Sequence, residues 1–253
     1  MIQVTDLKMS FKSELTGERQ QVLKGLNFKV EQGDCLAILG ESGSGKSTLG
    51  RILVGLLKPS SGEYTFLDQN PYKSRANRKF LSQNISIVFQ DYNTSVNPRF
   101  TVTEIVAESI NVLAKRSGIA VDKDAKVLEH LKTVGLDESF LDRFPHQLSG
   151  GQLQRVCIAR AIAIEPKVIV FDEAISSLDA HTQVQIMDLL RELQSKFDLT
   201  YLFITHDLTA VTYLCNKVMF LYQGNITELI DVADIGSTDD PYAKKLVEVV
   251  IDV

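Results

Sequence analysis

The sequence predicts an α/β protein whose core is a mainly parallel sheet covered by helices. Short apolar segments typical of buried strands, such as "DCLAILG" and "KVIVFDE", alternate with segments of helical periodicity. Between Thr101 and Phe144 the periodicity is helical throughout, which predicts an inserted helical subdomain. With 253 residues, 44% of them hydrophobic, the chain is long enough for one substantial core with a subdomain.

The first third of the chain is predicted to contain five strands and one helix. "IQVTDLKMSF" and "QVLKGLNFKV" alternate enough to be half-buried strands on either side of the polar loop "KSELTGERQ". "DCLAILG" follows as a buried parallel strand. We expect a helix from Lys46 to Leu57, ended by "KPSSG", and then the strands "GEYTFLD" and "ISIVFQD".

The helical stretch gives way to alternating strands and helices in the rest of the chain. Its apolar positions are Ile105, Val106, Ile110, Leu113, Val127, Leu128, Leu131 and Val134. After it come the strand "KVIVFDE", a helix from about Ala180 to Phe197, the strand "TYLFITHD", a further helix and the strand "KVMFLYQG". This alternation is what predicts the parallel sheet.

Composition excludes several classes of protein. The net charge of −5 and the isoelectric point near 5.5 argue against nucleic acid as a partner, because nucleic-acid-binding domains are usually basic. The cysteines are far apart and lack C-x-x-C spacing, so they are expected to be core residues in a reducing compartment: Cys35, Cys157 and Cys215. The basic cluster is interpreted as a solvated face: Lys73, Arg75, Arg78 and Lys79.

The sequence indicates a cytoplasmic protein. "IQVTDLKMS" after Met1 lacks the basic and apolar regions of a signal peptide, and no apolar run approaches the length that spans a bilayer. Any role at a membrane is therefore expected to depend on a partner protein.

The stretch "GESGSGKS" matches G-x-x-x-x-G-K-[ST] in full. Its residues are Gly40, Glu41, Ser42, Gly43, Ser44, Gly45, Lys46 and Ser47, with Thr48 next. The glycines let the backbone wrap closely around phosphate oxygens, Lys46 would reach the β- and γ-phosphates, and the Ser47 hydroxyl would ligate Mg²⁺. The motif alone predicts a nucleoside triphosphate site, which a kinase or a GTPase could also use.

Two later strands end in residues suited to catalysis. "KVIVFDE" places Asp172, a candidate Mg²⁺ ligand, and Glu173, a candidate general base, at the end where α/β sheets bind ligands. An acidic loop after a core strand is the structural alternative. "TYLFITHD" places His206 likewise; a lone histidine is usually structural, but this position favours a bond to the γ-phosphate.

A second anion-binding helix end is predicted in "FPHQLSGGQLQRV". Ser149 is available as the N-cap, and Gly150 and Gly151 would begin the helix. Exposed N–H groups and the positive end of the helix dipole suit an anion. One chain of this size thus carries two phosphate-binding features.

The order of these motifs resembles the ATP-binding subunits of ABC transporters. The signature of that family is "LSGGQ", here Leu148, Ser149, Gly150, Gly151 and Gln152. The resemblance covers nearly the whole chain and implies the P-loop NTPase fold of ABC ATPases, a single domain over residues 1–253. Residues 1–95 and 165–253 would form a RecA-like core with an antiparallel β subdomain, and about 96–164 the helical subdomain with the signature.

The resemblance also implies a use for the second helix end. Two subunits would pack head to tail, with ATP between the cradle of one and the signature of the other. Ser149 and the N–H groups of Gly150 and Gly151 would then meet the γ-phosphate of the partner's ATP. Because ADP lacks that phosphate, hydrolysis would let the dimer open.

Further positions match the family by place in the sequence. Phe11 corresponds to the aromatic residue that stacks on adenine, with plain core packing as the alternative, and Gln90 to the glutamine that senses Mg²⁺ and water. The loop that crosses the dimer interface is Ser176, Ser177, Leu178 and Asp179. Where the family more often has Pro-Thr after the glutamate, this chain has Ala174 and Ile175, which leaves both carboxylates in place and changes the residues that make the turn rigid.

Two segments resemble the peptide and nickel branch of importers. In that branch the segment from Ser95 to Thr103, within "QDYNTSVNPRFTVTEI", lies near the coupling helix of the permease. The tail "DDPYAKKLVEVV" resembles a His-Pro-Tyr-Thr motif, with Asp240 for histidine and Ala243 for threonine. The short tail and the "VNPR" run are most similar to nickel or metal-chelate uptake subunits, and oligopeptides remain open.

The expected function is therefore ATP hydrolysis that drives an ABC importer, with ATP and Mg²⁺ as cofactors. The expected partners are a paralogous ATPase, with a homodimer possible, two permeases and an external binding protein, at the cytoplasmic face of the membrane. An exporter or lipoprotein-release ATPase would share every catalytic residue. A soluble relative acting in translation or DNA repair would usually carry tandem cassettes or long arms, and this sequence has neither. Copurification from solubilised membranes would separate the three.

Overall fold

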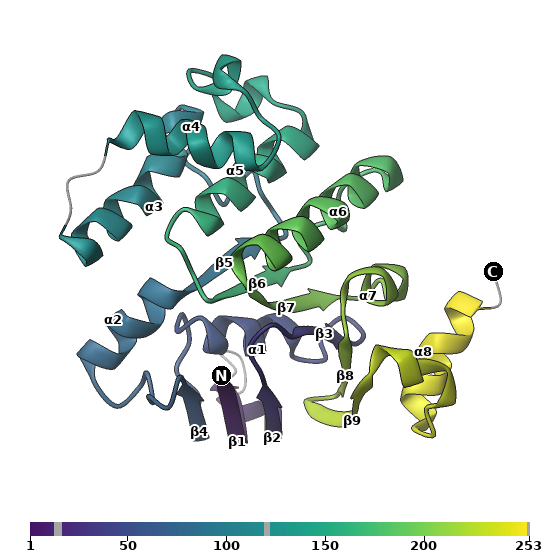
Figure 1. Ribbon diagram of the computed structural model, residues 1–253. Helices are drawn as coiled ribbons and strands as arrows, with labels where there is room; N and C mark the ends of the chain where they lie inside the picture. The colour runs from purple at the N-terminus through teal and green to yellow at the C-terminus, as the bar shows by residue number, and fades with distance from the viewer. Residues whose placement is uncertain (13–16, 119–121, 252–253) are drawn as a thin grey trace. The chain divides into compact units, whose positions relative to one another are not determined.

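The structure is a computed structural model of the chain that describes residues 1–12, 17–118 and 122–251. It divides into two compact units, Met1–Ser82 with Thr200–Val253, and Gln83–Leu199. In Figure 1 the first unit holds both the purple and the yellow ends of the chain, and the second is blue to green. The polar loop expected between the first two strands lies partly outside the described residues. The subdomain boundaries expected near residues 95 and 165 remain a prediction.

The first unit contains a three-stranded antiparallel sheet in the order β2-β1-β4, which confirms the antiparallel β subdomain (Figure 1). Its strands are β1 (Ile2–Lys12), β2 (Arg19–Val30) and β4 (Ser61–Phe66). One face is buried because apolar residues alternate with polar ones along β1 and β2. A Cβ at Gly62 would lie 2.2 Å from the Asp6 carbonyl oxygen, so this irregular pairing requires glycine there.

The same unit contains four strands in the order β7-β3-β8-β9. They are β3 (Cys35–Leu39), β7 (Thr200–Thr205), β8 (Lys217–Tyr222) and β9 (Asn225–Asp231). The first three pair in parallel and are almost wholly buried, as their continuous apolar runs predict. The antiparallel β9 was not predicted, because its mixed residues are only half-buried and give no clear alternation.

The helices of the first unit follow its strands. They are α1 (Lys46–Leu53), α2 (Arg75–Asn84, whose last two residues belong to the second unit), α7 (Leu208–Leu214) and α8 (Pro241–Ile251), with the short 3-10 helix η3 (Val232–Ser237). The prediction that the helix from Lys46 reaches Leu57 was wrong. The helix ends at Leu53 because Gly55, at φ 79°, leaves the helical region, and Leu57 N–H turns back to Arg51 O.

The second unit holds the helical stretch and two parallel strands, β5 (Ile85–Phe89) and β6 (Val168–Asp172). Its helices are α3 (Val102–Ser117), α4 (Lys123–Thr133), α5 (Gly150–Ile162) and α6 (Ala180–Phe197), with the 3-10 turns η1 (Glu138–Phe140) and η2 (Pro145–Gln147). Thr101 and Glu104 form a capping box at α3, and Asp122 caps α4. The predicted apolar positions are buried, except that Leu128 is half-buried.

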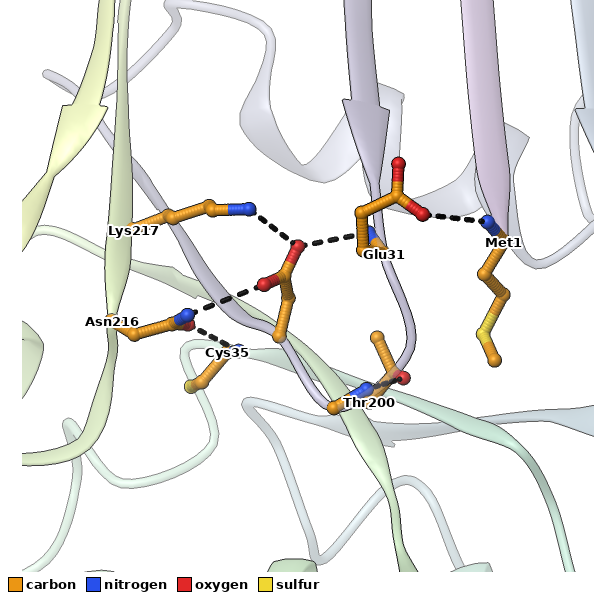
Figure 2. Close-up of polar contacts among 8 residues, drawn as sticks. Met1, Glu31, Cys35, Thr200, Asn216 and Lys217 are labelled. Carbon is orange, nitrogen blue, oxygen red and sulfur yellow. Dashed lines mark hydrogen bonds and ion pairs between the residues drawn. The ribbon is translucent and has the colours of Figure 1, made fainter.

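The start of β3, which leads into the glycine-rich loop, is held by a buried carboxylate. Asp34 accepts hydrogen bonds from the Glu31 N–H (2.8 Å), the Lys217 ammonium (2.9 Å) and the Asn216 amide (3.2 Å). The Asn216 amide oxygen in turn accepts from the Cys35 N–H at 2.7 Å, as Figure 2 shows. Asp34 and Asn216 together therefore tie the start of β3 to the start of β8.

The remaining contacts in Figure 2 join this corner to the ends of two other strands. The Gly33 N–H donates to the Thr200 hydroxyl at 2.9 Å, and the amino group of Met1 lies 3.7 Å from the Glu31 carboxylate (Figure 2). These contacts fix the start of β3, the strand that leads into the glycine-rich loop.

Three composition-based expectations can be compared with the described part of the chain. Each of the cysteines Cys35, Cys157 and Cys215 is a buried free thiol, as predicted. The basic cluster near α2 is exposed, as predicted for a solvated face. Across residues 1–12, 17–118 and 122–251, no helix combines the length and the hydropathy needed to cross a membrane.

Candidate nucleotide-binding and catalytic site

The glycine-rich loop lies at the carboxyl end of β3, in the first unit. A Cβ at Gly40 would come within 2.2 Å of the Leu221 carbonyl oxygen, and a Cβ at Gly45 within 2.7 Å of Leu23 Cδ2. Gly45 has φ 108° and is the N-cap of α1, without a side-chain cap. The first N–H groups of α1 therefore face the loop, and the loop has room only for glycine at these two positions.

Lys46 is the first residue of α1, and its side chain binds the backbone of this loop. The residue is 5% exposed, and its ammonium donates to Gly40 O (2.7 Å) and Glu41 O (3.0 Å). Among the described residues the buried Ser44 hydroxyl has no hydrogen-bond partner. A buried polar atom of this kind is usually satisfied by a ligand or by water. The ammonium, the helix end and the Ser44 hydroxyl together fit a polyphosphate.

The other candidates of the first unit also lie at solvent-accessible positions. Ser42 and Gly43 are exposed, and Ser47 and Thr48 are half-buried in the first turn of α1. Phe11, in β1, is 41% exposed, which argues against the core alternative and leaves its ring accessible for stacking.

His206 follows directly after β7 and is exposed. The next residue, Asp207, caps α7 by accepting from the Thr209 N–H at 2.8 Å. This cap fixes the turn that carries the histidine, since it sets where the strand stops and the helix begins.

In the second unit the two carboxylates lie at the end of β6. Asp172 is the last residue of the strand and is 7% exposed, whereas Glu173 is half-buried. Glu173 has φ 50°, a left-handed conformation that costs a non-glycine residue about 1–3 kcal/mol. Such strain is often found where a side chain must point in one direction for function.

The turn after Glu173 is held without the proline that the family more often has. The Ser176 hydroxyl donates to Glu173 O at 2.9 Å, and the Gln183 amide donates to Ile175 O at 2.9 Å. Gln183 lies on α6 and had no role in the sequence-based prediction. Side-chain hydrogen bonds therefore supply the rigidity that Ala174 and Ile175 do not.

Gln90 follows β5 at the strand end beside β6. Phe89 is opposite Asp172 in the parallel register, so Gln90 and Glu173 are the first residues after the ends of two adjacent strands. Gln90 is exposed. This part of the site is thus set by strand pairing that sequence periodicity alone predicts only approximately.

The predicted signature forms the start of α5. The Ser149 hydroxyl accepts from the Gln152 N–H at 3.3 Å, and the Gln152 side chain accepts from the Ser149 N–H at 2.9 Å, a full capping box. A Cβ at Gly150 would lie 2.6 Å from the Tyr92 hydroxyl, and one at Gly151 would lie 2.6 Å from Thr182 Cγ2. A side chain at either glycine would therefore force Tyr92 or Thr182 to shift, and neither neighbour was predicted from the sequence.

The residues that flank the signature and the predicted interface loop are partly accessible. Leu148 and Ser176 are half-buried, as is Leu178, and Ser177 is exposed. Asp179 caps α6 by accepting from the Thr182 N–H at 3.0 Å and the Thr182 hydroxyl at 2.7 Å. These hydrogen bonds hold the pKa of Asp179 below its usual value.

No group of three or more His, Cys, Asp or Glu side chains in the described ranges could by itself hold a metal ion. Mg²⁺ at phosphate sites takes few protein ligands and keeps water and phosphate oxygens. A hydroxyl, an amide and one carboxylate are donors of the right chemical kind. Ser47 in the first unit, and Gln90 and Asp172 in the second, each carry such a donor and stay candidate ligands of Mg²⁺ that arrives with a nucleotide.

Comparison with known proteins agrees with these features. The ABC transporter family matches residues 23–176, which is more than half of the chain. The chain is 42% identical to the metal-staphylopine import system ATP-binding protein CntF of Staphylococcus aureus over 98% of both proteins. It is 45% identical to the nickel import ATP-binding protein NikE of Escherichia coli, over 86% of this chain and 81% of that protein.

Solved structures show the same fold. The cassette MJ0796, a dimer in a post-hydrolysis state bound to ADP and Pi, matches with a TM-score of 0.81 and 30% identity over 92% of this chain and 99% of that one. The cbiO1 protein of Clostridium perfringens, part of the ABC transporter complex cbiONQ, matches with a TM-score of 0.79 and 29% identity over 100% and 98%. The chain therefore belongs to the ABC transporter family, as one of its ATP-hydrolysing cassette subunits.

Proposed function

We propose that this chain powers the import of a metal ion or a metal chelate. The observation that carries the proposal is the 42% identity, over 98% of both proteins, to a metal-staphylopine import ATPase. The likeness to a nickel import ATPase supports the same class of cargo. These relatives do not favour an export or lipoprotein-release system. The names of both relatives refer to metal import and not to peptides.

In this proposal the glycine-rich loop binds the triphosphate of ATP. Lys46 and the N–H groups at the start of α1 contact the phosphates, and Phe11 stacks on adenine. Bound Mg²⁺ would neutralise charge on the β- and γ-phosphate oxygens, with Ser47, Asp172 and Gln90 as its protein ligands.

The water that attacks the γ-phosphate would be activated by Glu173. General-base assistance by one carboxylate contributes about 10²–10⁴ in rate. His206 would donate to the γ-phosphate and hold the same water. The left-handed Glu173 and its hydrogen-bonded turn support this role, since they fix the backbone from which the carboxylate extends.

We propose further that each nucleotide is completed by a second cassette. The N–H groups at the start of α5, with Ser149, would contact the γ-phosphate held by the partner, and the loop of Ser176, Ser177, Leu178 and Asp179 would cross the interface. The dimeric state of the solved cassette MJ0796 supports this arrangement. The favoured partner is a paralogous ATPase, although a homodimer remains possible.

The remaining proposed partners are two permeases and an external substrate-binding protein. The chain would lie peripherally on the cytoplasmic face of the membrane, in contact with the permeases through the segment from Ser95 to Thr103. Copurification from detergent-solubilised membranes tests this part: recovery of an export permease, ribosomes or DNA in place of import permeases would contradict it.

Substitution of Glu173 by glutamine tests the catalytic proposal. The variant should retain ATP binding and lose turnover by about 10²-fold or more, because an amide cannot accept the proton from water. It should also accumulate a closed dimer with ATP, detectable by size-exclusion chromatography with the paralogous partner present. Lys46→Ala is the control, since it should weaken ATP binding itself. Hydrolysis by Glu173→Gln at close to the parent rate would show that another group is the base.

A further inference from the structure

The helix α8 reaches the first peptide of the glycine-rich loop. The Glu41 N–H donates to the Tyr242 phenol oxygen at 2.8 Å, across 201 positions of sequence. Tyr242 lies in the first turn of α8, and all these residues belong to the first unit. The contact is therefore a feature of the fold and not of the local sequence.

The peptide group that Tyr242 holds is the one that also binds Lys46. The N–H of Glu41 and the carbonyl of Gly40 belong to one planar peptide, and the Gly40 carbonyl accepts from the Lys46 ammonium at 2.7 Å. Rotation of this peptide would move the carbonyl away from the ammonium. The phenol and the ammonium therefore bind the two opposite edges of one planar peptide group.

Tyr242 is itself held in place by its neighbours. Its ring packs against Tyr222 with centroids 4.4 Å apart, at the end of β8. Asp240 accepts from the Ala243 N–H at 2.8 Å and so caps the helix, and Ala243 is fully buried. The first turn of α8, which carries the tyrosine, is therefore both capped and packed at the two positions that depart from the His-Pro-Tyr-Thr pattern.

The other side of the loop is held by the turn that follows β8. The Gly224 N–H donates to Ser44 O at 3.1 Å. The Lys245–Glu41 ion pair, at 3.9 Å between exposed side chains, adds little. The phenol is the contact that fixes the Gly40–Glu41 peptide from outside the loop.

We propose that Tyr242 is a positioning residue of the nucleotide site, which orients Lys46 through the Gly40–Glu41 peptide. The inference rests on the proposed role of the loop in binding ATP. It adds a link between α8 and nucleotide affinity, so a displacement of α8 weakens ATP binding.

Tyr242→Phe is the test, because it removes the phenol oxygen and keeps the ring against Tyr222. Residue-resolved amide hydrogen exchange should show faster exchange of the Glu41 N–H in the nucleotide-free variant. The loss of one hydrogen bond corresponds to a rise of about two- to tenfold in the Kd for ATP of the isolated chain. In the assembled complex KM for ATP should rise while kcat at saturating ATP stays close to that of the parent.

Two controls separate this inference from the proposed function. Tyr213→Phe makes the same chemical change on α7 and should leave both measurements unchanged. Lys46→Ala should weaken ATP binding; if it does not, the assignment of the loop as the ATP site fails. If Lys46→Ala weakens binding while Tyr242→Phe leaves the Glu41 exchange or the ATP affinity unchanged, the positioning role alone is wrong. Equal thermal unfolding of parent and Tyr242→Phe excludes a general loss of structure.

Discussion

At the residue scale, the polar side chains around the site act by fixing backbone. Asp34 is 6% exposed and accepts hydrogen bonds that tie β3 to β8. Burial alone raises the pKa of this carboxyl, but the Glu31 N–H, Lys217 and Asn216 together outweigh it, so the pKa lies below the ordinary value of 3.8. The charged form is thus favoured in the folded chain.

Asp34→Asn should destabilise the chain by about 2 kcal/mol at neutral pH, because hydrogen bonds to a charged acceptor are lost. The folded pKa is depressed, so the stabilisation is fully present above the unfolded pKa and is lost as the pH falls through the folded pKa. Urea unfolding of parent and variant checks this. The difference between them should be constant from pH 7 to about 5 and shrink below about pH 4. A difference that stays constant to pH 3 would contradict the role of the charge.

The sequence alone indicates candidate site residues where a motif fixes their order and spacing. The glycine-rich loop and the Asp172–Glu173 pair have fixed order along the chain, so their positions could be read directly. Tyr242, Tyr92 and Thr182 could not, because each acts on a residue distant in sequence. The glycine pair at 150 and 151 was the available signal for the last two, since adjacent glycines at a helix start often mean close packing.

At the element scale, α4 contains a buried histidine that lowers the stability of the folded chain. His130 is 7% exposed, and its Nε2 has no hydrogen-bond partner among the described residues. Burial lowers its pKa and Lys126 adds to this effect, whereas Glu129 and Glu165 oppose it. The imidazole is therefore held in the neutral form.

His130→Leu should raise the free energy of unfolding by about 1 kcal/mol near pH 8, because it removes an unsatisfied buried polar atom. In the parent, the unfolded histidine gains a proton near its ordinary pKa of 6.5 while the folded one resists it, so stability should fall as the pH drops below about 6.5. The variant should lack that dependence. Thermal unfolding at pH 8 and pH 5.5 measures both. A parent and a variant with the same pH slope would contradict this account.

Element types were predictable more reliably than their ends. The buried strands and the long helices have strong periodicity, and the structure contains them. The end of α1 was misplaced because the left-handed Gly55 was taken as part of the helix. The strand β9 was missed because it is stabilised by pairing with β8 and not by its own pattern.

At the scale of the whole molecule, the two helix ends proposed to bind phosphate belong to different compact units. The glycine-rich loop is in the first unit and the signature in the second. Both helix ends were predicted from the sequence, and the dimer was predicted from the family resemblance. We propose that the second helix end contacts the nucleotide held by a partner, so that each chain would supply half of two sites.

The most direct test compares ATP affinity of the isolated chain with hydrolysis by the assembled complex, for Ser149→Arg and for Lys46→Ala. We expect Ser149→Arg to leave the Kd for ATP within about twofold of the parent while hydrolysis falls by about tenfold or more, because the arginine blocks a site on the partner. Lys46→Ala should lose affinity in the isolated chain. If Ser149→Arg weakened ATP binding in the isolated chain as much as Lys46→Ala does, the signature would serve its own nucleotide and the account would be wrong.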